Sequence, residues 1–132
     1  IRIYNSSGSE TARIPLSGVK GLDISGKTLF AVGDFGMILY DISDPYEPVR
    51  AGLFPSPYTR NVSVAGDFAY LSAGPDGLKV VNVHDPYRPF LSSRCSDVFA
   101  VDAVPGEDGR SAFVVDTDGV RTIDIIIPAW LR

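Results

Sequence analysis

Residues 77–89 read GLKVVNVHDPYRP, and two other segments of the chain share their frame. Each segment opens with a glycine, continues with a largely apolar run, and has a proline nine residues after the glycine. The other two are GMILYDISDP from Gly36 and GVRTIDIIIP from Gly119, so the spacings are 41 and 42 residues. A fixed period of this length is typical of repeat folds, in which each unit is one supersecondary element that packs on its neighbours.

The apolar segments between these landmarks are short, and they predict strands. They are rich in Val, Ile, Leu, Phe and Tyr and end in Gly, Pro, Asp or Ser, a composition that favours strands. None shows the helical i, i+3, i+4, i+7 pattern. The third run of each unit is apolar on both faces, which suits a strand covered on both sides. The expected strands are 21–25, 28–32, 37–42, 49–54, 62–65, 68–72, 78–83, 90–93, 100–104, 111–116 and 120–125.

The pentapeptide Asp-Pro-Tyr-x-Pro occurs twice, beginning at Asp44 and at Asp85. Proline at its second position fixes φ and favours a type I or II turn, which the aspartate can cap. The second proline begins the next strand at a sheet edge, where a missing N–H is tolerated. We interpret the pentapeptide as a turn, with Tyr46 and Tyr87 at the rim. The alternative is a tyrosine pair that faces a ligand.

Four short strands in about 40–45 residues, repeated in one frame, predict an all-β chain of β-propeller blades. About three four-stranded repeats of 41–42 residues are expected. Residues 1–18 would form the tail of a preceding blade and a connector, followed by blades at 19–61, 62–99 and, in part, 100–132. Closed propellers usually have about 4–8 blades, so the ring is expected to be incomplete. Either the chain is part of a longer polypeptide, which its mid-strand beginning favours, or other chains complete the ring.

The repeats resemble the LVIVD-repeat β-propellers over roughly residues 19–128. The third unit departs from the pattern, because Ile126 and Ile127 replace its Ser-Asp. The resemblance implies a bacterial or archaeal protein at the cell surface or outside the cell, and it transfers no catalytic residues. In the second unit it is carried by Gly66, Ala69, Tyr70, Gly77, Leu78, Val80, Asp85, Pro86 and Pro89.

Composition excludes several kinds of function. The net charge is −4 and the twelve basic residues are scattered, which argues against a nucleic-acid partner. No apolar run approaches the roughly 20 residues of a membrane-spanning helix.

Cys95 is the only cysteine, so an internal disulfide is excluded, and His84 is the only histidine. These two residues are the only thiol–imidazole candidates, and neither lies in a recognised nucleophile context. Common catalytic motifs are absent, so an enzyme is the less favoured interpretation.

Acidic residues give weaker candidates. Asp116 and Asp118 precede a glycine as in the opening of a calcium loop, although Val120 and Arg121 interrupt that pattern. A hairpin turn is the favoured interpretation, and calcium is the alternative. Asp23 and Asp102 lie in the first strand of their units. If that strand lines a central channel, the two carboxylates would make it acidic and suited to a cation or a basic partner.

Two function classes remain open. The first is a non-enzymatic scaffold that binds other protein chains or further blades, with Trp130 near the carboxyl end expected to pack against something. The second is a propeller enzyme or a carbohydrate-binding protein whose site lies at the channel mouth or in further blades. Aromatic residues at one rim would suit the stacking of sugars. These are Phe35, Tyr46, Tyr58 and Tyr87.

Overall fold

The structure is a computed structural model that describes residues 1–132 as four separate antiparallel sheets. We call the last three sheets blades 1, 2 and 3. The amino-terminal sheet pairs β1 (Arg2–Tyr4) with β2 (Glu10–Arg13). Blade 1 contains β3 (Val19–Ser25), β4 (Thr28–Gly33), β5 (Gly36–Asp41) and β6 (Val49–Phe54); blade 2 contains β7 (Asn61–Ala65), β8 (Phe68–Ser72), β9 (Leu78–Asn82) and β10 (Phe90–Cys95); blade 3 contains β11 (Asp102–Pro105), β12 (Ser111–Asp116) and β13 (Gly119–Asp124).

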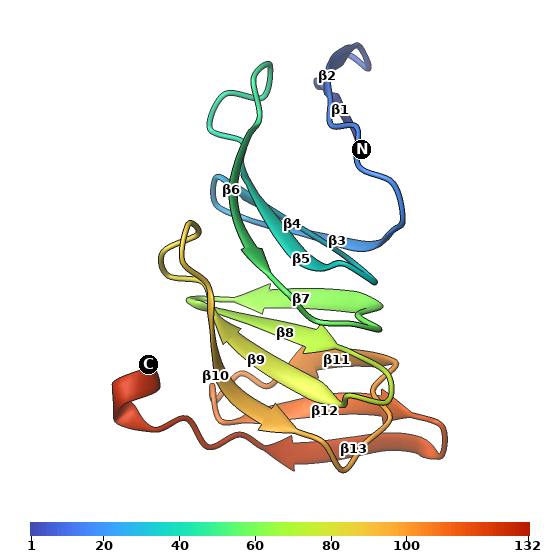
Figure 1. Cartoon of the computed structure of the whole chain (residues 1–132), viewed down its shortest axis with the longest axis vertical. Coiled ribbons are helices and arrows are strands. Elements are labelled where there is room, and N and C mark those ends of the chain that lie inside the picture. Colours follow the sequence, from blue (N-terminus) through green and yellow to red (C-terminus); the bar gives the residue numbers. More distant parts are fainter.

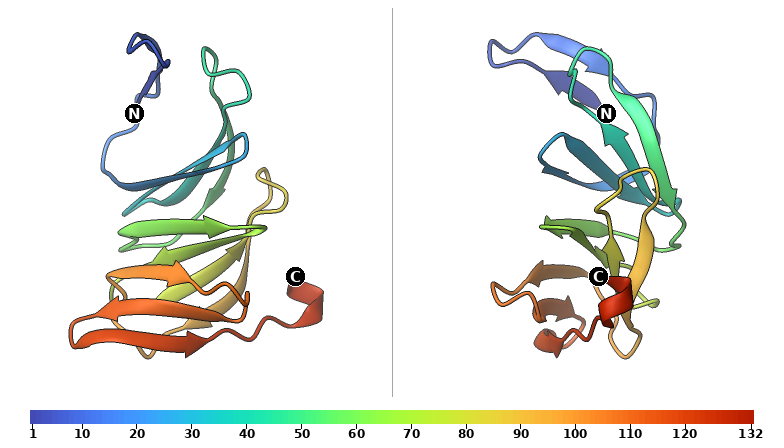
Figure 2. Two further views of the ribbon diagram at one scale, coloured as in Figure 1. Left: turned by 180° about the vertical axis from the view of Figure 1, so that it is seen from behind. Right: turned by 90° about the vertical axis from the view of Figure 1, so that its left-hand side faces the viewer.

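The sheets follow one another along an arc, with the amino-terminal hairpin at one end and blade 3 at the other (Figures 1 and 2). Within each blade the strands pair in sequence order, and the first strands β3, β7 and β11 contact one another across blades. The outer strands β6 and β10 lie on the opposite side of the arc (Figure 2, right). The all-β prediction and the incomplete ring of blades are both confirmed.

Three apolar cores lie between the sheets and not within a single one. The first joins the amino-terminal sheet to blade 1, the second joins blades 1 and 2, and the third joins blades 2 and 3. Alternate side chains of each strand serve the two neighbouring cores. On β5, for example, Met37 and Leu39 pack toward blade 2, whereas Ile38 and Tyr40 pack toward the amino-terminal sheet. A blade therefore depends on its neighbours to bury its apolar faces.

The burial of the third strand differs between the blades. Nearly all of β5 and all of β9 are buried, as expected for strands covered on both faces. The corresponding strand β13 is exposed except at Ile123, which is half-buried. The two-sided apolar pattern therefore predicts burial correctly for two blades, and fails for the third because no further sheet covers it.

Several boundaries differ from the sequence expectation. The strand β2 was not expected, because its residues are polar and small and give no apolar run. The first strand of blade 3 begins at Asp102, while Ala100 forms only an isolated bridge with Gly74. A short 3₁₀ turn (η1, Ala129–Leu131) follows β13, and Trp130 within it is 80% exposed, contrary to the expectation that it packs. No helix is long and apolar enough to cross a membrane.

Candidate interaction surface

The two Asp-Pro-Tyr-x-Pro segments form β-turns. The amide of the fourth residue donates to the carbonyl of Asp44 at 3.1 Å in the first turn, and to that of Asp85 at 3.0 Å in the second. The aspartate carboxylate accepts the amide of the following tyrosine at 2.9 and 3.0 Å. The turn prediction is therefore confirmed, and both tyrosine side chains are exposed.

Each of these turns also contacts the outer strand of the preceding sheet. Thr11 on β2 donates its hydroxyl to the carbonyl of the first proline of the first turn, at 3.2 Å. Gly52 on β6 lies so close to the corresponding carbonyl of the second turn that a Cβ there would overlap it. Ser92 on β10 donates its hydroxyl to the carbonyl of Leu131, in the turn that follows β13, at 2.8 Å. The repeated pentapeptide thus serves the contact between neighbouring blades.

The residue at the end of each buried third strand stabilises the short segment between that strand and the Asp-Pro-Tyr-x-Pro turn. Ser43 donates its hydroxyl (2.7 Å) and its amide (2.9 Å) to the carboxylate of Asp41, and these bonds hold the pKa of that carboxyl below its ordinary value of 3.8. Asn82 takes the equivalent place in blade 2 and accepts the amide of His84 at 3.0 Å. These short polar residues therefore shape the chain before the turn.

The two acidic residues of the first strands lie between blades. Asp23 accepts the amide of Val64 on β7 at 2.7 Å, and its other carboxylate oxygen accepts the amide of Ile24 at 2.8 Å. Asp102 accepts the side-chain amide of Asn61, also on β7. Both carboxylates therefore join neighbouring first strands. They are not at equivalent positions, however, because Asp23 lies opposite Phe30 and Asp102 lies opposite Val115 in their blades.

Replacing Asp23 by alanine is expected to lower the free energy of unfolding by about 1–2 kcal/mol, because the amide of Val64 loses its partner at the junction of blades 1 and 2. Urea denaturation followed by tryptophan fluorescence or circular dichroism measures this change. Asp67→Ala is the matched control, since Asp67 meets only the exposed imidazole of His84, and a shift within about 0.5 kcal/mol is expected. Equal effects of the two substitutions would contradict the inter-blade role of Asp23.

A buried polar cluster, which the sequence interpretation missed, connects the β6–β7 connector to blade 2. Lys79 donates to the hydroxyl of Ser56 at 2.9 Å and lies 3.5 Å from the carboxylate of Asp76. Thr59 donates to the carbonyl of Ser56 at 2.8 Å. A serine beside a lysine resembles a nucleophile and its base. Here Ser56 is 1% and Lys79 7% exposed, and neither lines a pocket of the structure, so the cluster holds the connector in place.

The structure separates several residues that the sequence offered as candidates. Cys95 ends β10 beside the start of β9, whereas His84 follows the other end of β9, so they form no pair. Asp116 and Asp118 both contact Arg121, at 2.6 and 3.9 Å. The cation that these carboxylates meet is therefore a guanidinium, and no group of three or more His, Cys, Asp or Glu side chains is placed to hold a metal.

The four aromatic residues considered for carbohydrate stacking do not share one rim. Because successive hairpins of an antiparallel sheet turn at opposite ends, Tyr46 and Tyr87 lie at one end of their blades, and Phe35 and Tyr58 at the other. Phe35 also packs against the core below the amino-terminal sheet. Tyr58 is exposed and has a φ of 63°, which is unusual for a residue with a Cβ. Gly18 lies three residues before Gly21, as Tyr58 lies three residues before Asn61, and it has a similar φ of 75°. A glycine at this place in the first repeat was therefore the signal in the sequence that Tyr58 would need a positive φ.

The face of blade 3 that points away from blade 2, here called its outer face, carries exposed apolar residues. When blades 1 and 3 are aligned on the glycine that opens the third strand, the residues of this face align with residues of blade 1 that are buried against blade 2. Phe30, for example, is 2% exposed, whereas Phe113 at the same place in its repeat is 47% exposed. The covered set is Phe30, Val32, Met37 and Leu39, and the uncovered set is Phe113, Val115, Val120 and Thr122, to which Val104 on β11 adds another exposed apolar side chain.

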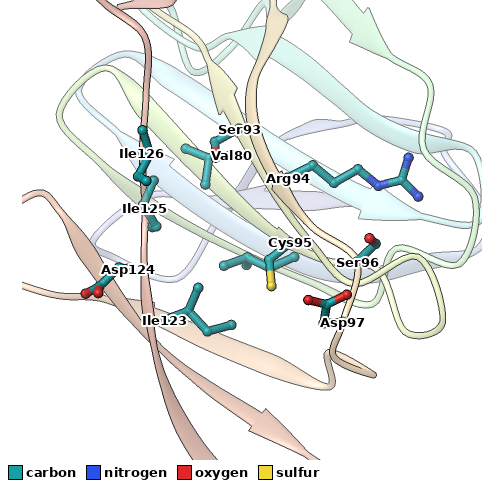
Figure 3. Close-up of a pocket in the computed structure, with 11 residues that line it drawn as sticks. Val80, Ser93, Arg94, Cys95, Ser96, Asp97, Ile123, Asp124, Ile125 and Ile126 are labelled. Carbon is teal, nitrogen blue, oxygen red and sulfur yellow. The ribbon is translucent and has the colours of Figure 1, made fainter.

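A groove of about 360 Å³ adjoins the outer part of blade 3 (Figure 3). It lies between the end of β13 and the strands β9 and β10 of blade 2. Its lining is apolar at Leu78, Val80 and Ile123, with the thiol of Cys95 beside them and Asp97 at one side, whereas the carboxylate of Asp124 points away from the groove. Leu78 and Val80 belong to the core between blades 2 and 3, so the groove is continuous with an existing interface.

These contacts define the class of protein: the chain is a stack of β-propeller-type blades that is open at blade 3. A family model described as the LVIVD repeat matches residues 57–97. This segment covers the connector and strands of blade 2, so the resemblance seen in the sequence is confirmed there. Searches of curated proteins and of solved structures gave no match.

Proposed function

We propose that the chain is a non-catalytic propeller module that binds other polypeptide segments through its uncovered blade faces. The observation that carries this proposal is the outer face of blade 3, whose apolar residues correspond to residues that the next sheet buries in blade 1. Burying one such side chain contributes about 1.5–3 kcal/mol. A surface of this kind favours association. The resemblance to LVIVD proteins supports a place at the cell surface or outside the cell.

Blade 1 offers a second uncovered area on its opposite side. Leu22 is 49% exposed and Ile24 is 59% exposed, both on β3, and they line an apolar pocket of about 260 Å³ beside the amino-terminal sheet. The partner class that fits both areas is another propeller-type blade, because such a blade covers the same positions elsewhere in this chain. If two copies met head to tail, blade 3 of one copy would cover the area beside β3 of the other, and a third copy could continue the series.

Native mass spectrometry over a range of concentrations tests this proposal. The chain is expected to form assemblies heavier than one 14.2 kDa copy, and Phe113→Glu is expected to reduce them to single copies by placing a charge on the apolar face. Val49→Glu is the control, since Val49 is equally apolar and exposed but lies on the outer strand β6. Assemblies that persist in Phe113→Glu, or a wild-type chain that stays single at high concentration, would contradict the proposal.

A further inference from the structure

The first two blades each carry a cation at the same place in the repeat. Lys20 directly precedes Gly21, and Arg60 directly precedes Asn61, which takes the place of Gly21 in the second repeat. Lys20 is neutralised within the chain, because its ammonium lies 2.9 Å from the carboxylate of Asp34 in the β4–β5 hairpin. Arg60 is exposed and takes part in no salt bridge.

The β8–β9 hairpin of blade 2 explains why Arg60 has no partner within the chain. Asp34 lies two residues before the glycine that opens the third strand of blade 1, and Pro75 lies at the same place in blade 2. The one carboxylate of the β8–β9 hairpin, that of Asp76, lies 3.5 Å from the buried ammonium of Lys79. The place that a carboxylate takes in blade 1 is therefore taken by an uncharged residue in blade 2.

Contacts with blade 3 and its connector hold the guanidinium of Arg60 in place. Its Cζ lies 5.2 Å from the centre of the Phe99 ring, a distance at which a cation and a ring attract each other. Both side chains pack beside Gly74, where a Cβ would lie 3.5 Å from Nε of Arg60 and 3.6 Å from the ring. Gly74 and Ala100 exchange backbone hydrogen bonds of 2.8 and 3.0 Å. The ring restricts the guanidinium but supplies none of the acceptor oxygens with which its N–H groups pair.

Tyr58, on the same connector, is both strained and exposed. Pro57 and Tyr58 are the middle residues of a turn, and the φ of Tyr58 is 63°, a value that such a turn normally gives to glycine or asparagine. Tyr58 is 53% exposed, so burial in a core does not account for a tyrosine here. The connector is firmly anchored, because Ser56 and Thr59 are buried and their hydroxyls are bonded at 2.9 Å. An observed strain of this kind points to a functional contact.

We propose that Arg60 and Tyr58 bind an acidic segment of a partner protein, whose carboxylate pairs with the guanidinium as Asp34 pairs with Lys20. Arginine and tyrosine are among the residues that most often dominate the energy of protein–protein interfaces, which favours a polypeptide as the partner. The residues that form the site lie within 56–100, so it does not depend on either end of the sequence. The inference goes beyond the proposed function, since charge and not an uncovered blade face selects this partner.

A peptide titration followed by NMR tests the proposal with the intact chain. The probe is the capped tetrapeptide acetyl-GDFG-amide, a copy of residues 33–36 that carries the carboxylate copied from Asp34. The Nε–H signal of Arg60 and the backbone amide signal of Tyr58 are expected to shift until they saturate. A second peptide, in which asparagine replaces the aspartate, is expected to bind about three- to tenfold more weakly, because it cannot form the charge-assisted pair.

Matched variants locate the binding. Arg60→Gln is expected to weaken binding of the aspartate peptide about three- to tenfold, and Arg60→Lys about twofold, since an ammonium keeps the charge but lacks the planar fork. Tyr58→Gly is expected to weaken binding about twofold without lowering the urea midpoint, because glycine adopts a positive φ without strain. Arg88→Gln is the control and should bind normally. Arg88 is also exposed and without a salt bridge, but it lies in the turn at the other end of blade 2.

Three results would overturn the site. They are the absence of any shift at Arg60, equal binding of the aspartate and asparagine peptides, and unchanged binding by Arg60→Gln. A lower urea midpoint for Tyr58→Gly would show that Tyr58 has a structural role instead. If glucuronate binds more tightly than the peptide and depends on Arg60, the ligand is an acidic sugar and a protein partner is wrong. Any of these results leaves the proposed function standing, provided that the chain still assembles through Phe113, which lies outside the site.

Discussion

Replacing Gly77 by alanine is expected to lower the free energy of unfolding by about 3–5 kcal/mol, among the larger effects that a single substitution produces. Gly77 opens the third strand of blade 2 with a φ of 81°, a conformation that costs energy for any residue with a Cβ. A Cβ would also overlap the carbonyl oxygen of Cys95 and lie 3.0 Å from the Cα of Ser96. Backbone atoms of a paired strand cannot move aside cheaply, so the clash adds to the strain.

Gly119→Ala supplies the control at the same place in the next repeat. Gly119 also has a positive φ, of 139°, but no atom lies within 4 Å of a Cβ built there. This substitution is expected to cost only about 1–2 kcal/mol, from backbone strain alone. Urea denaturation of both variants measures the two values. Similar losses would show that strain alone, and not the approach of the outer strand, requires a glycine at this position.

The second large effect is expected for Phe30→Ala. Phe30 is 2% exposed in the core between blades 1 and 2, and removing a buried phenylalanine side chain typically costs about 3–5 kcal/mol. Phe113→Ala changes the corresponding residue of blade 3, which is 47% exposed, and about 1 kcal/mol is expected because much of that side chain already meets water. Thermal or urea unfolding of single copies gives both values.

The comparison of these two phenylalanines also bears on the proposed function. In an assembly that covers blade 3, the cost of Phe113→Ala should rise toward that of Phe30→Ala, because the side chain would then be buried as well. A cost that is already large in single copies would contradict the uncovered face described here. A small cost for Phe30→Ala would contradict the core between blades 1 and 2.

Much of the fold could be predicted from local chemistry. The glycines that open the third strands adopt the positive φ that a tight hairpin requires, and the Asp-Pro-Tyr-x-Pro segments form the expected turns. Both signals act over a few residues, so they do not depend on distant contacts. The strand β2 was missed because Thr11 and its neighbours form no apolar run, and its pairing with β1 supplies what the sequence pattern lacks.

The candidate surface was much harder to anticipate. Trp130 was expected to be covered and is exposed, while the polar pair Ser56 and Lys79 is buried between blades. Asp23 and Asp102 were placed on the first strands correctly, yet the sequence could not show that both carboxylates accept hydrogen bonds from β7. Each of these outcomes depends on which residues of another blade lie opposite, a relation that spacing along one chain does not contain.

The sequence by itself determined the repeat, the strands and their turns, because glycine and proline geometry and the alternation of apolar residues act locally. Only the tertiary structure decided which apolar faces are covered. Phe30 and Phe113 occupy the same place in their repeats, and they differ because burial is a property of two packed sheets, of which the sequence of one repeat describes only one.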